Sequence, residues 1–183
     1  MDPITTPEDA IWSEGPYRVV LKRPRPDKKH VVLQSPDVVH ILPVTSDGTI
    51  ILLRQARYGA GCMVLEAPAG GIDAGETPAE AARRELREEI GYGSEDLVRV
   101  GTPGAFSSPG VISERSTLFV ARGCAPVGGE HEDIPTVRLT PDDALALVTP
   151  PGTDAQPAAD PEAVVADVNT MLLLTLARAA GLI

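Results

Sequence analysis

The chain has 183 residues, of which 43% are hydrophobic and 23% are charged, as is usual for a soluble globular protein with one domain. Its net charge of −10 argues against a general nucleic-acid binder, which needs a basic face for phosphates, but it leaves room for a local site that binds a small anion. The two cysteines, Cys62 and Cys124, lie far apart, so neither a disulfide framework nor a cysteine zinc site is expected.

The two ends of the chain carry no targeting or membrane signal. The first ten residues, MDPITTPEDA, are acidic and do not form a signal peptide. The longest late apolar stretch, between Asp167 and Arg178, has ten residues and is too short to span a bilayer. We therefore expect a cytoplasmic protein without a membrane partner.

The first 37 residues are expected to form an arm. Residues 1–16 show no periodicity and are interpreted as a loose or partner-bound segment. The β-branched runs at 17–21 and 30–33 predict short strands, separated by the basic, proline-broken KRPRPDKK. Residues 38–183 are assigned to the main domain, which includes a C-terminal helix.

Strands dominate the first part of the main domain and return after its first helix. VVHILPV and TIILLRQ flank Ser46-Asp47-Gly48, a good hairpin turn. Further strands are expected at 62–66, 97–101, 116–121 and 134–139. Many strands in one block with two or three helices predict an α+β fold, a mixed β-sheet sandwiched between helices.

Three helices are expected. The first begins with Thr77 as N-cap, Pro78 at the first helical position and Glu80 completing a capping box, and it ends before Gly91. A short helix is predicted over 144–148, and a linker over 150–161. The last helix is predicted over 163–180, with apolar residues at helical spacing: Val164, Val168, Met171, Leu172 and Leu176.

Three acidic residues, Glu85, Glu88 and Glu89, fall on the first of these helices. Offsets of three and four place them on one face, where like charges repel unless a cation compensates them. Hard divalent cations, above all Mg²⁺, are held by such carboxylates. Arg84 and Arg87 could neutralise some of this charge. The alternative is a solvated helix with i,i+4 ion pairs. A glycine-rich loop (Gly70, Gly71, Gly75) precedes the helix and allows close approach of a ligand, which favours the metal site.

The spacing of these residues resembles the Nudix box. Gly70 is followed after five residues by Glu76, and after seven more by RELREEIGY at 84–92. The single departure is Tyr92, where the strict pattern has a bulky aliphatic residue. EAPAG (66–70), RQARY (54–58), SPGVISER (108–115) and EHEDI (130–134) resemble the ADP-ribose pyrophosphatase branch of the Nudix hydrolases.

The resemblance implies a Mg²⁺-dependent pyrophosphohydrolase, with Mn²⁺ as a substitute. It implies that Glu85, Glu89 and the Ala69 carbonyl bind metal. Glu88 would share in this binding or tune the liganding groups, and Glu132 would join the metal cluster when substrate is bound. Glu130 matches the residue proposed as the general base. The alternative for Glu130 and Glu132 is an exposed acidic loop.

The resemblance also implies the residues that contact substrate. Arg57 matches a phosphate contact and Glu114 a ribose contact; the alternatives are a surface arginine and a salt bridge between Glu114 and Arg115. Arg84 is expected to orient a liganding glutamate. Three further positions are assigned to substrate binding: Gly70 and Gly71 in the glycine-rich loop, and Pro109 in the SPGVISER segment.

The implied activity is hydrolysis of the pyrophosphate bond of ADP-ribose or a related nucleoside diphosphate sugar. Alternatives are a pyrophosphatase for GDP-mannose, for another nucleoside diphosphate sugar or for dinucleotides, and an ADP-ribose sensor that does not cleave. The arm contains Ile11, Trp12, Tyr17 and an apolar run at 19–21, which need burial. We therefore expect a homodimer formed through the arm.

Overall fold

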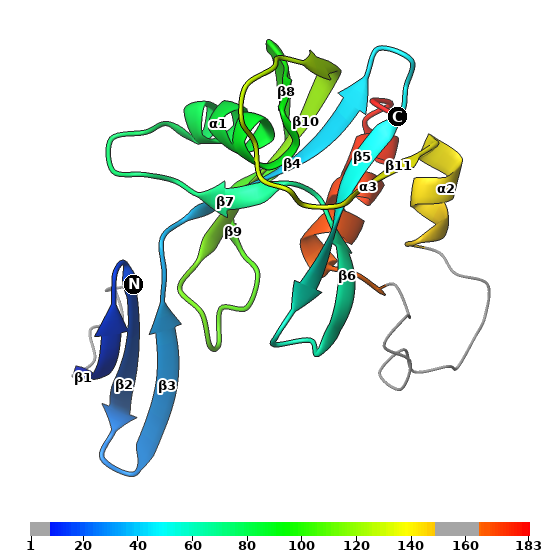
Figure 1. The fold of residues 1–183 in the computed structure, drawn as a ribbon. Coiled ribbons are helices and arrows are strands. Elements are labelled where there is room, and N and C mark those ends of the chain that lie inside the picture. Colours follow the sequence, from blue (N-terminus) through cyan, green and yellow to red (C-terminus); the bar gives the residue numbers. More distant parts are fainter. Residues whose placement is uncertain (1–7, 149–164) are drawn as a thin grey trace.

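The computed structural model describes residues 8–148 and 165–183 (Figure 1). The helices are α1 (Pro78–Ile90), α2 (Pro141–Ala146) and α3 (Val168–Ala179). The strands are β1 (Glu8–Glu14), β2 (Tyr17–Arg25), β3 (Lys28–Gln34), β4 (Val38–Thr45), β5 (Ile50–Arg57), β6 (Cys62–Glu66), β7 (Ala69–Gly71), β8 (Tyr92–Gly93), β9 (Asp96–Phe106), β10 (Arg115–Pro126), β11 (Thr136–Leu139) and β12 (Val165–Ala166).

The central sheet is mixed. Its main path runs β12-β6-β5-β4-β10-β8, while β11 pairs with β5, β7 with β4 and β9 with β10. The β4–β10 and β12–β6 pairs are parallel, and the other pairs are antiparallel. This arrangement places the short strand β7 beside β4, directly under helix α1.

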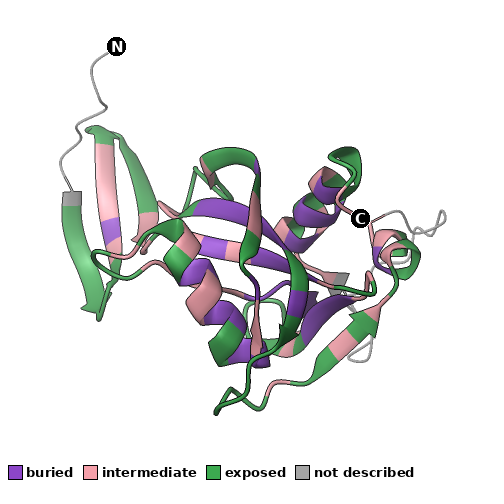
Figure 2. Cartoon of the chain, turned by 90° about the horizontal axis from the view of Figure 1, so that it is seen from above, coloured by how far each residue is buried: buried purple, intermediate pink, exposed green. Residues whose placement is uncertain are grey.

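Alternating side chains give the sheet two buried faces. On β4, Ile41 packs with α1, whereas Leu42 packs with α3; Ile51 and Leu52 alternate in the same way on β5. Buried residues accordingly follow the central strands and the inward faces of the helices (Figure 2). The predicted α+β fold with a sheet between helices is confirmed.

The N-terminal region is more regular than expected. It forms a separate three-stranded sheet in the order β1-β2-β3, and β1 lies within residues that were interpreted as a loose or partner-bound segment. The predicted break at KRPRPDKK is wrong as well: β2 continues to Arg25, and a register shift between Lys22 and Arg25 accommodates Pro24.

The N-terminal sheet stands to one side of the body (Figures 1 and 2). It is joined to the β9–β10 loop by two backbone hydrogen bonds, from Leu33 N to Val111 O at 2.8 Å and from Ser113 N to Leu33 O at 2.9 Å. Residues 35–37 connect it to β4.

The end of the chain differs from the prediction in two ways. Helix α3 begins at Val168, not at 163, because the Asp167 side chain accepts hydrogen bonds from the amides of Asn169 and Thr170 and caps it. Its buried face consists of Thr170, Leu173, Leu174 and Ala177, whereas Val168 and Leu172 are exposed. The predicted linker at 150–161 and Val164 lie outside the described residues. Helix α2 begins at Pro141, three residues before the predicted start at 144.

Among the helices that the structure describes, none has the length and apolar character needed to cross a membrane.

Candidate active site

Helix α1 begins and ends as its sequence predicts. Thr77 accepts a hydrogen bond from Glu80 N at 3.3 Å, and the Glu80 carboxylate accepts one from Thr77 N at 2.8 Å, which completes the capping box. Gly91 ends the helix with a φ of 68°, in the left-handed region that favours glycine. These caps fix the register in which the acidic side chains leave the helix.

Glu85 and Glu89 are both buried, each with 8% of its surface exposed. Glu89 accepts a hydrogen bond from the Ala69 amide at 2.8 Å, so it lies against β7. Burial raises the pKa of Glu89 to about 7, and burial also raises the pKa of Glu85. Removing two like charges from water costs free energy unless a cation compensates them.

Glu88 is different from its two neighbours. It is exposed, whereas Glu85 and Glu89 are buried. It still lies near Glu85, because the same Arg84 nitrogen contacts both carboxylates.

Arg84 joins the acids to the loop before the helix. Its guanidinium donates to Glu76 at 3.0 Å, to Glu85 at 2.6 Å, to Glu88 at 3.0 Å and to the Gly71 carbonyl at 2.7 Å. These bonds, those to Glu76 foremost, raise the pKa of Arg84. Arg84 thus contacts both Glu85 and Glu88 and holds them in place.

Arg87 does not share this role. Within residues 8–148 and 165–183 its side chain forms no ion pair, so the idea that it neutralises the glutamates is wrong. It leaves the helix on the far side.

The late acidic loop docks on the end of α1. The Glu132 amide donates to the Glu88 carbonyl at 2.7 Å, and the His131 ring packs on Gly91. Glu88, Glu130, His131 and Glu132 line a hollow of about 280 Å³. The negative charge of Glu132 contributes to the raised pKa of both Glu85 and Glu89, which places Glu132 near the buried pair.

Arg57 stands at the end of β5 and is held by Glu66 on β6. Its Nε donates to the two carboxylate oxygens of Glu66 at 2.9 and 2.8 Å, and this bonding raises the pKa of Arg57. Its side chain is about half exposed, and Arg57 lines a hollow of about 350 Å³. Sequence reasoning missed Glu66, because only the pairing of β5 with β6 reveals that it holds Arg57.

Glu114 and Pro109 lie on the β9–β10 loop, beside β3. Glu114 accepts from Ser107 Oγ at 3.3 Å, and burial raises the pKa of Glu114. Arg115 stacks over the Phe106 ring, with its Cζ 5.5 Å from the ring centre, and within the described part of the chain it forms no salt bridge with Glu114. Among the described residues, no hydrogen bond or ion pair links Glu114 or Pro109 to the acids of α1.

The donor chemistry of the site fits a hard divalent cation. Glu85 and Glu89 offer buried carboxylate oxygens against neighbouring residues of β7, Glu85 over Gly70 and Glu89 at the Ala69 amide. Within the described part of the chain, no three acidic, histidine or cysteine side chains converge on one point. Mg²⁺ needs no such cage, because it is held by one or two carboxylates, waters and substrate phosphates.

Comparison with known proteins agrees with this geometry. The chain is 33% identical over 125 residues to an ADP-ribose pyrophosphatase of Bacillus subtilis (strain 168), a match that covers 66% of each protein. It is 31% identical over 149 residues to a GDP-mannose pyrophosphatase of Yersinia enterocolitica, covering 75% of this chain and 70% of the relative. The chain thus spans about two thirds of the length of the Bacillus protein.

A solved structure titled "Crystal structure of ADP compounds hydrolase" has the same fold, with a TM-score of 0.68 at 23% identity, over 98% of this chain and 96% of that one. The model of the NUDIX domain matches residues 34–162. With the capped acidic helix, the glycine strand beside it and this match over most of its length, the chain belongs to the NUDIX domain family.

Proposed function

We propose that this chain hydrolyses the pyrophosphate bond of ADP-ribose, or of a closely related nucleoside diphosphate sugar. From ADP-ribose it releases AMP and ribose 5-phosphate. The observation that carries the proposal is the pair of buried carboxylates, Glu85 and Glu89, packed against Gly70 and Ala69. The names of the relatives that match most of the chain support the same reaction.

The metal in this proposal is Mg²⁺, for which Mn²⁺ can substitute. Glu85, Glu89 and the Ala69 carbonyl would hold it, with Glu88 beside them and Glu132 from the late loop. When bound, the ion neutralises the negative charge that develops on the pyrophosphate oxygens. The raised pKa values of Glu85 and Glu89 support this assignment, because a cation compensates the charges that burial disfavours.

The protein's own groups position and activate the reactants. Glu130 lies on the hollow formed by the late loop and α1, from which it can take the proton of the attacking water. Arg57 has a half-exposed side chain; Glu66 takes the edge formed by Nε and Nη2, and the other edge of the guanidinium would donate to phosphate oxygens. Arg84 holds Glu85 and Glu88 in place.

The remaining assignments concern the loops around the substrate. Gly70 and Gly71 form the strand against which the diphosphate would lie, and Glu114 with Pro109 would contact the terminal ribose. Glu114 would reach that ribose from the β9–β10 loop, whose partner strand β3 belongs to the N-terminal sheet.

A panel of substrates tests the proposal. ADP-ribose, ADP-glucose and GDP-mannose at equal concentration, each with Mg²⁺ and with Mn²⁺, are followed by chromatography of AMP, GMP and the sugar phosphates. We expect ADP-ribose to give the highest kcat/KM. The similarity to a GDP-mannose pyrophosphatase makes preference for the guanine substrate the main alternative. Binding of ADP-ribose without any product would instead indicate a sensor.

We also propose a homodimer formed through the N-terminal sheet. Ile11, Trp12, Tyr17 and Val31 expose 59%, 47%, 47% and 55% of their surfaces on this sheet. Such a group of apolar side chains is typical of a protein interface. A second copy of the chain is the expected partner. The cytoplasmic location and the assignment of residues 1–37 to an arm stay predictions from the sequence.

A further inference from the structure

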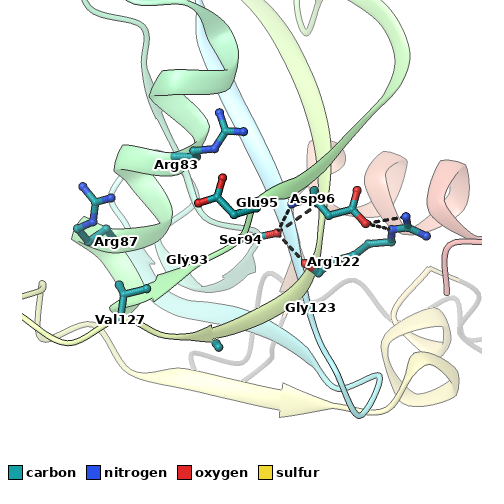
Figure 3. Close-up of a pocket in the computed structure, with 10 residues that line it drawn as sticks. Arg83, Arg87, Gly93, Ser94, Glu95, Asp96, Arg122, Gly123 and Val127 are labelled. Atoms are coloured by element: carbon teal, nitrogen blue, oxygen red, sulfur yellow. Dashed lines mark hydrogen bonds and ion pairs between the residues drawn. The ribbon is translucent and has the colours of Figure 1, made fainter.

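A second hollow lies on the opposite side of α1 from Glu85 and Glu89. It has a volume of about 430 Å³ and lies between α1, the turn from β8 to β9, and the end of β10 (Figure 3). Arg83 and Arg87 project from α1 on this side, one helical turn apart (Figure 3). No role in the proposed hydrolysis uses this hollow.

Arg83 and Arg87 lack the partners that arginines of a protein surface usually have. Arg83 is half-buried, its Nε is buried without a hydrogen-bond partner, and its Nη1 reaches only the Ala79 carbonyl at 3.4 Å. Within the described residues, neither guanidinium forms an ion pair with a carboxylate. A buried guanidinium donor without an acceptor costs free energy, because water no longer satisfies it.

The helix end explains only part of this arrangement. Arg87 lies in the last turn of α1, where a positive charge suits the helix dipole. That reason does not extend to Arg83, which lies one turn earlier and has the unsatisfied donor. Its Nε is too deeply buried to meet a ligand, but Arg83 lines the hollow, where an acceptor from outside the chain could meet its Nη atoms.

The facing wall of the hollow is held by its own bonds. Ser94 Oγ donates to the Arg122 carbonyl at 2.6 Å and accepts from Asp96 N at 3.1 Å, and Arg122 Nε donates to Asp96 at 2.8 Å. Figure 3 shows these bonds on the side away from Arg83 and Arg87. Asp96 is therefore already neutralised, which leaves Glu95 as the acid on this wall without an ion pair among the described residues.

Two glycines line the hollow, and one of them leaves space for a ligand. Gly123 is the extra residue where the pairing of β10 with β4 shifts register; its φ is 62°, and no atom lies within 4 Å of the place where a Cβ would stand. A bulged residue has no partner in the sheet. At Gly93 the space is filled, because Val127 Cγ1 lies 2.7 Å from where a Cβ would stand.

We propose that this hollow binds the phosphate group of a small phosphomonoester or inorganic phosphate. Three arginines against two acids make its lining net positive in a chain whose net charge is −10. Two guanidinium groups one turn apart on a helix can donate together to the oxygens of one phosphate. The hollow is large enough for a sugar phosphate but confined by α1 and β10, which suits a small ligand.

Amide chemical shifts test this site in the full chain, without metal and with a chelator present. Inorganic phosphate and ribose 5-phosphate are titrated separately, against sodium chloride at matched ionic strength. We expect saturable shifts at Gly93, Ser94 and Gly123 with either phosphate compound. If only inorganic phosphate saturates the site, free phosphate is the preferred ligand. If ribose 5-phosphate binds more tightly, a phosphomonoester is preferred. Either result supports the proposed phosphate site.

Substitutions then assign the binding to the two arginines. Arg83→Gln and Arg87→Gln should each weaken binding at these amides by about tenfold or more, because each removes a charge-assisted donor pair. Arg87 is exposed, so its substitution should leave the fold intact even if that of Arg83 does not. Arg99→Gln, an exposed arginine on β9 that does not line the hollow, is the matched control.

The proposal is overturned if chloride produces the same shifts as phosphate, or if the shifts occur only around Glu85, Glu89 and Arg57. Equal weakening by Arg99→Gln would also overturn it, because it would show a general effect of charge. None of these outcomes depends on catalysis, so they are independent of the proposed hydrolase activity.

Discussion

The carboxylate of Glu85 occupies the space that a side chain on residue 70 would need. A Cβ built on Gly70 would stand 1.9 Å from Glu85 Oε1 and 2.0 Å from its Cδ. No van der Waals contact is that short, so a larger residue at 70 requires Glu85 to move. The glycine on β7 and the acid on α1 are thus a single structural unit.

Gly70→Ala should fold but lose most of its activity. The group that must move is the end of a flexible side chain, so the cost in stability is small, whereas the position of Glu85 is lost. Steady-state hydrolysis and a thermal melt measure the two effects. Gly71→Ala is the matched comparison, because its Cβ would meet nothing nearer than Pro36 Cβ at 4.0 Å, and it should lose far less activity. Equal losses in both variants would contradict this assignment.

Glu85→Gln and Glu89→Gln should each remove most turnover while the fold survives. Each substitution keeps the size of the side chain and removes the charge that a divalent cation needs. Binding of Mn²⁺, followed by electron paramagnetic resonance, should weaken in parallel with kcat. Glu95→Gln changes an exposed acid outside the site and controls for a general effect of charge. Near wild-type turnover in either active-site variant would refute the metal assignment.

The metal-free protein should lose stability as the pH rises from about 5 to 8. The pKa of Glu89 is about 7 in the folded state, above its ordinary value of 4.5, so the folded state holds a proton that the unfolded state has lost. Between these values the unfolded state binds fewer protons, and a rise in pH therefore lowers the free energy of unfolding, by up to roughly 3 kcal/mol for this group.

Urea unfolding in the presence of a chelator, at pH 5 and at pH 8, measures this loss. Glu89→Gln should show a smaller loss over the same range, and the difference between the two proteins isolates Glu89. Identical pH dependence in the wild type and the variant would show that Glu89 titrates normally.

Arg84→Lys should reduce kcat and thermal stability together. An ammonium group cannot reproduce the planar fork that reaches Glu76, Glu85 and the Gly71 carbonyl at the same time. The apparent affinity for Mg²⁺ should fall as well, because Glu85 loses the group that orients it. Arg99→Lys, on an exposed strand position, should change none of these quantities. Activity of Arg84→Lys equal to that of the wild type would mean that the charge alone suffices.

Trp12→Glu should dissociate the proposed dimer. The substitution places a charge among the exposed apolar side chains of the N-terminal sheet. Light scattering coupled to size exclusion should show the monomer mass, and KM for the nucleotide should rise. Val168→Glu alters an exposed valine at the start of α3, where an acid suits the helix dipole, and should leave the mass unchanged. A monomeric wild type would rule out the proposal.

The sequence by itself determined helix α1 and the spacing of its glutamates. Its caps, Thr77, Glu80 and Gly91, act on neighbouring backbone groups, so their effect can be derived from spacing alone. The same holds for the hairpin turn at Ser46-Asp47-Gly48 and for the glutamates one turn apart on α1. The alternating apolar residues of β4 and β5 similarly predict strands with two buried faces.

Only the tertiary structure decided the features that depend on distant parts of the chain. Strand β1 has little apolar pattern and forms because β2 offers it hydrogen bonds. The buried face of α3 is set by the sheet against which it packs, and the apolar spacing alone pointed to Val168 and Leu172, which are exposed. The bond between Arg57 and Glu66, the place of Glu85 against Gly70, and the unpartnered Nε of Arg83 arise likewise from packing between elements, which spacing along a chain does not record.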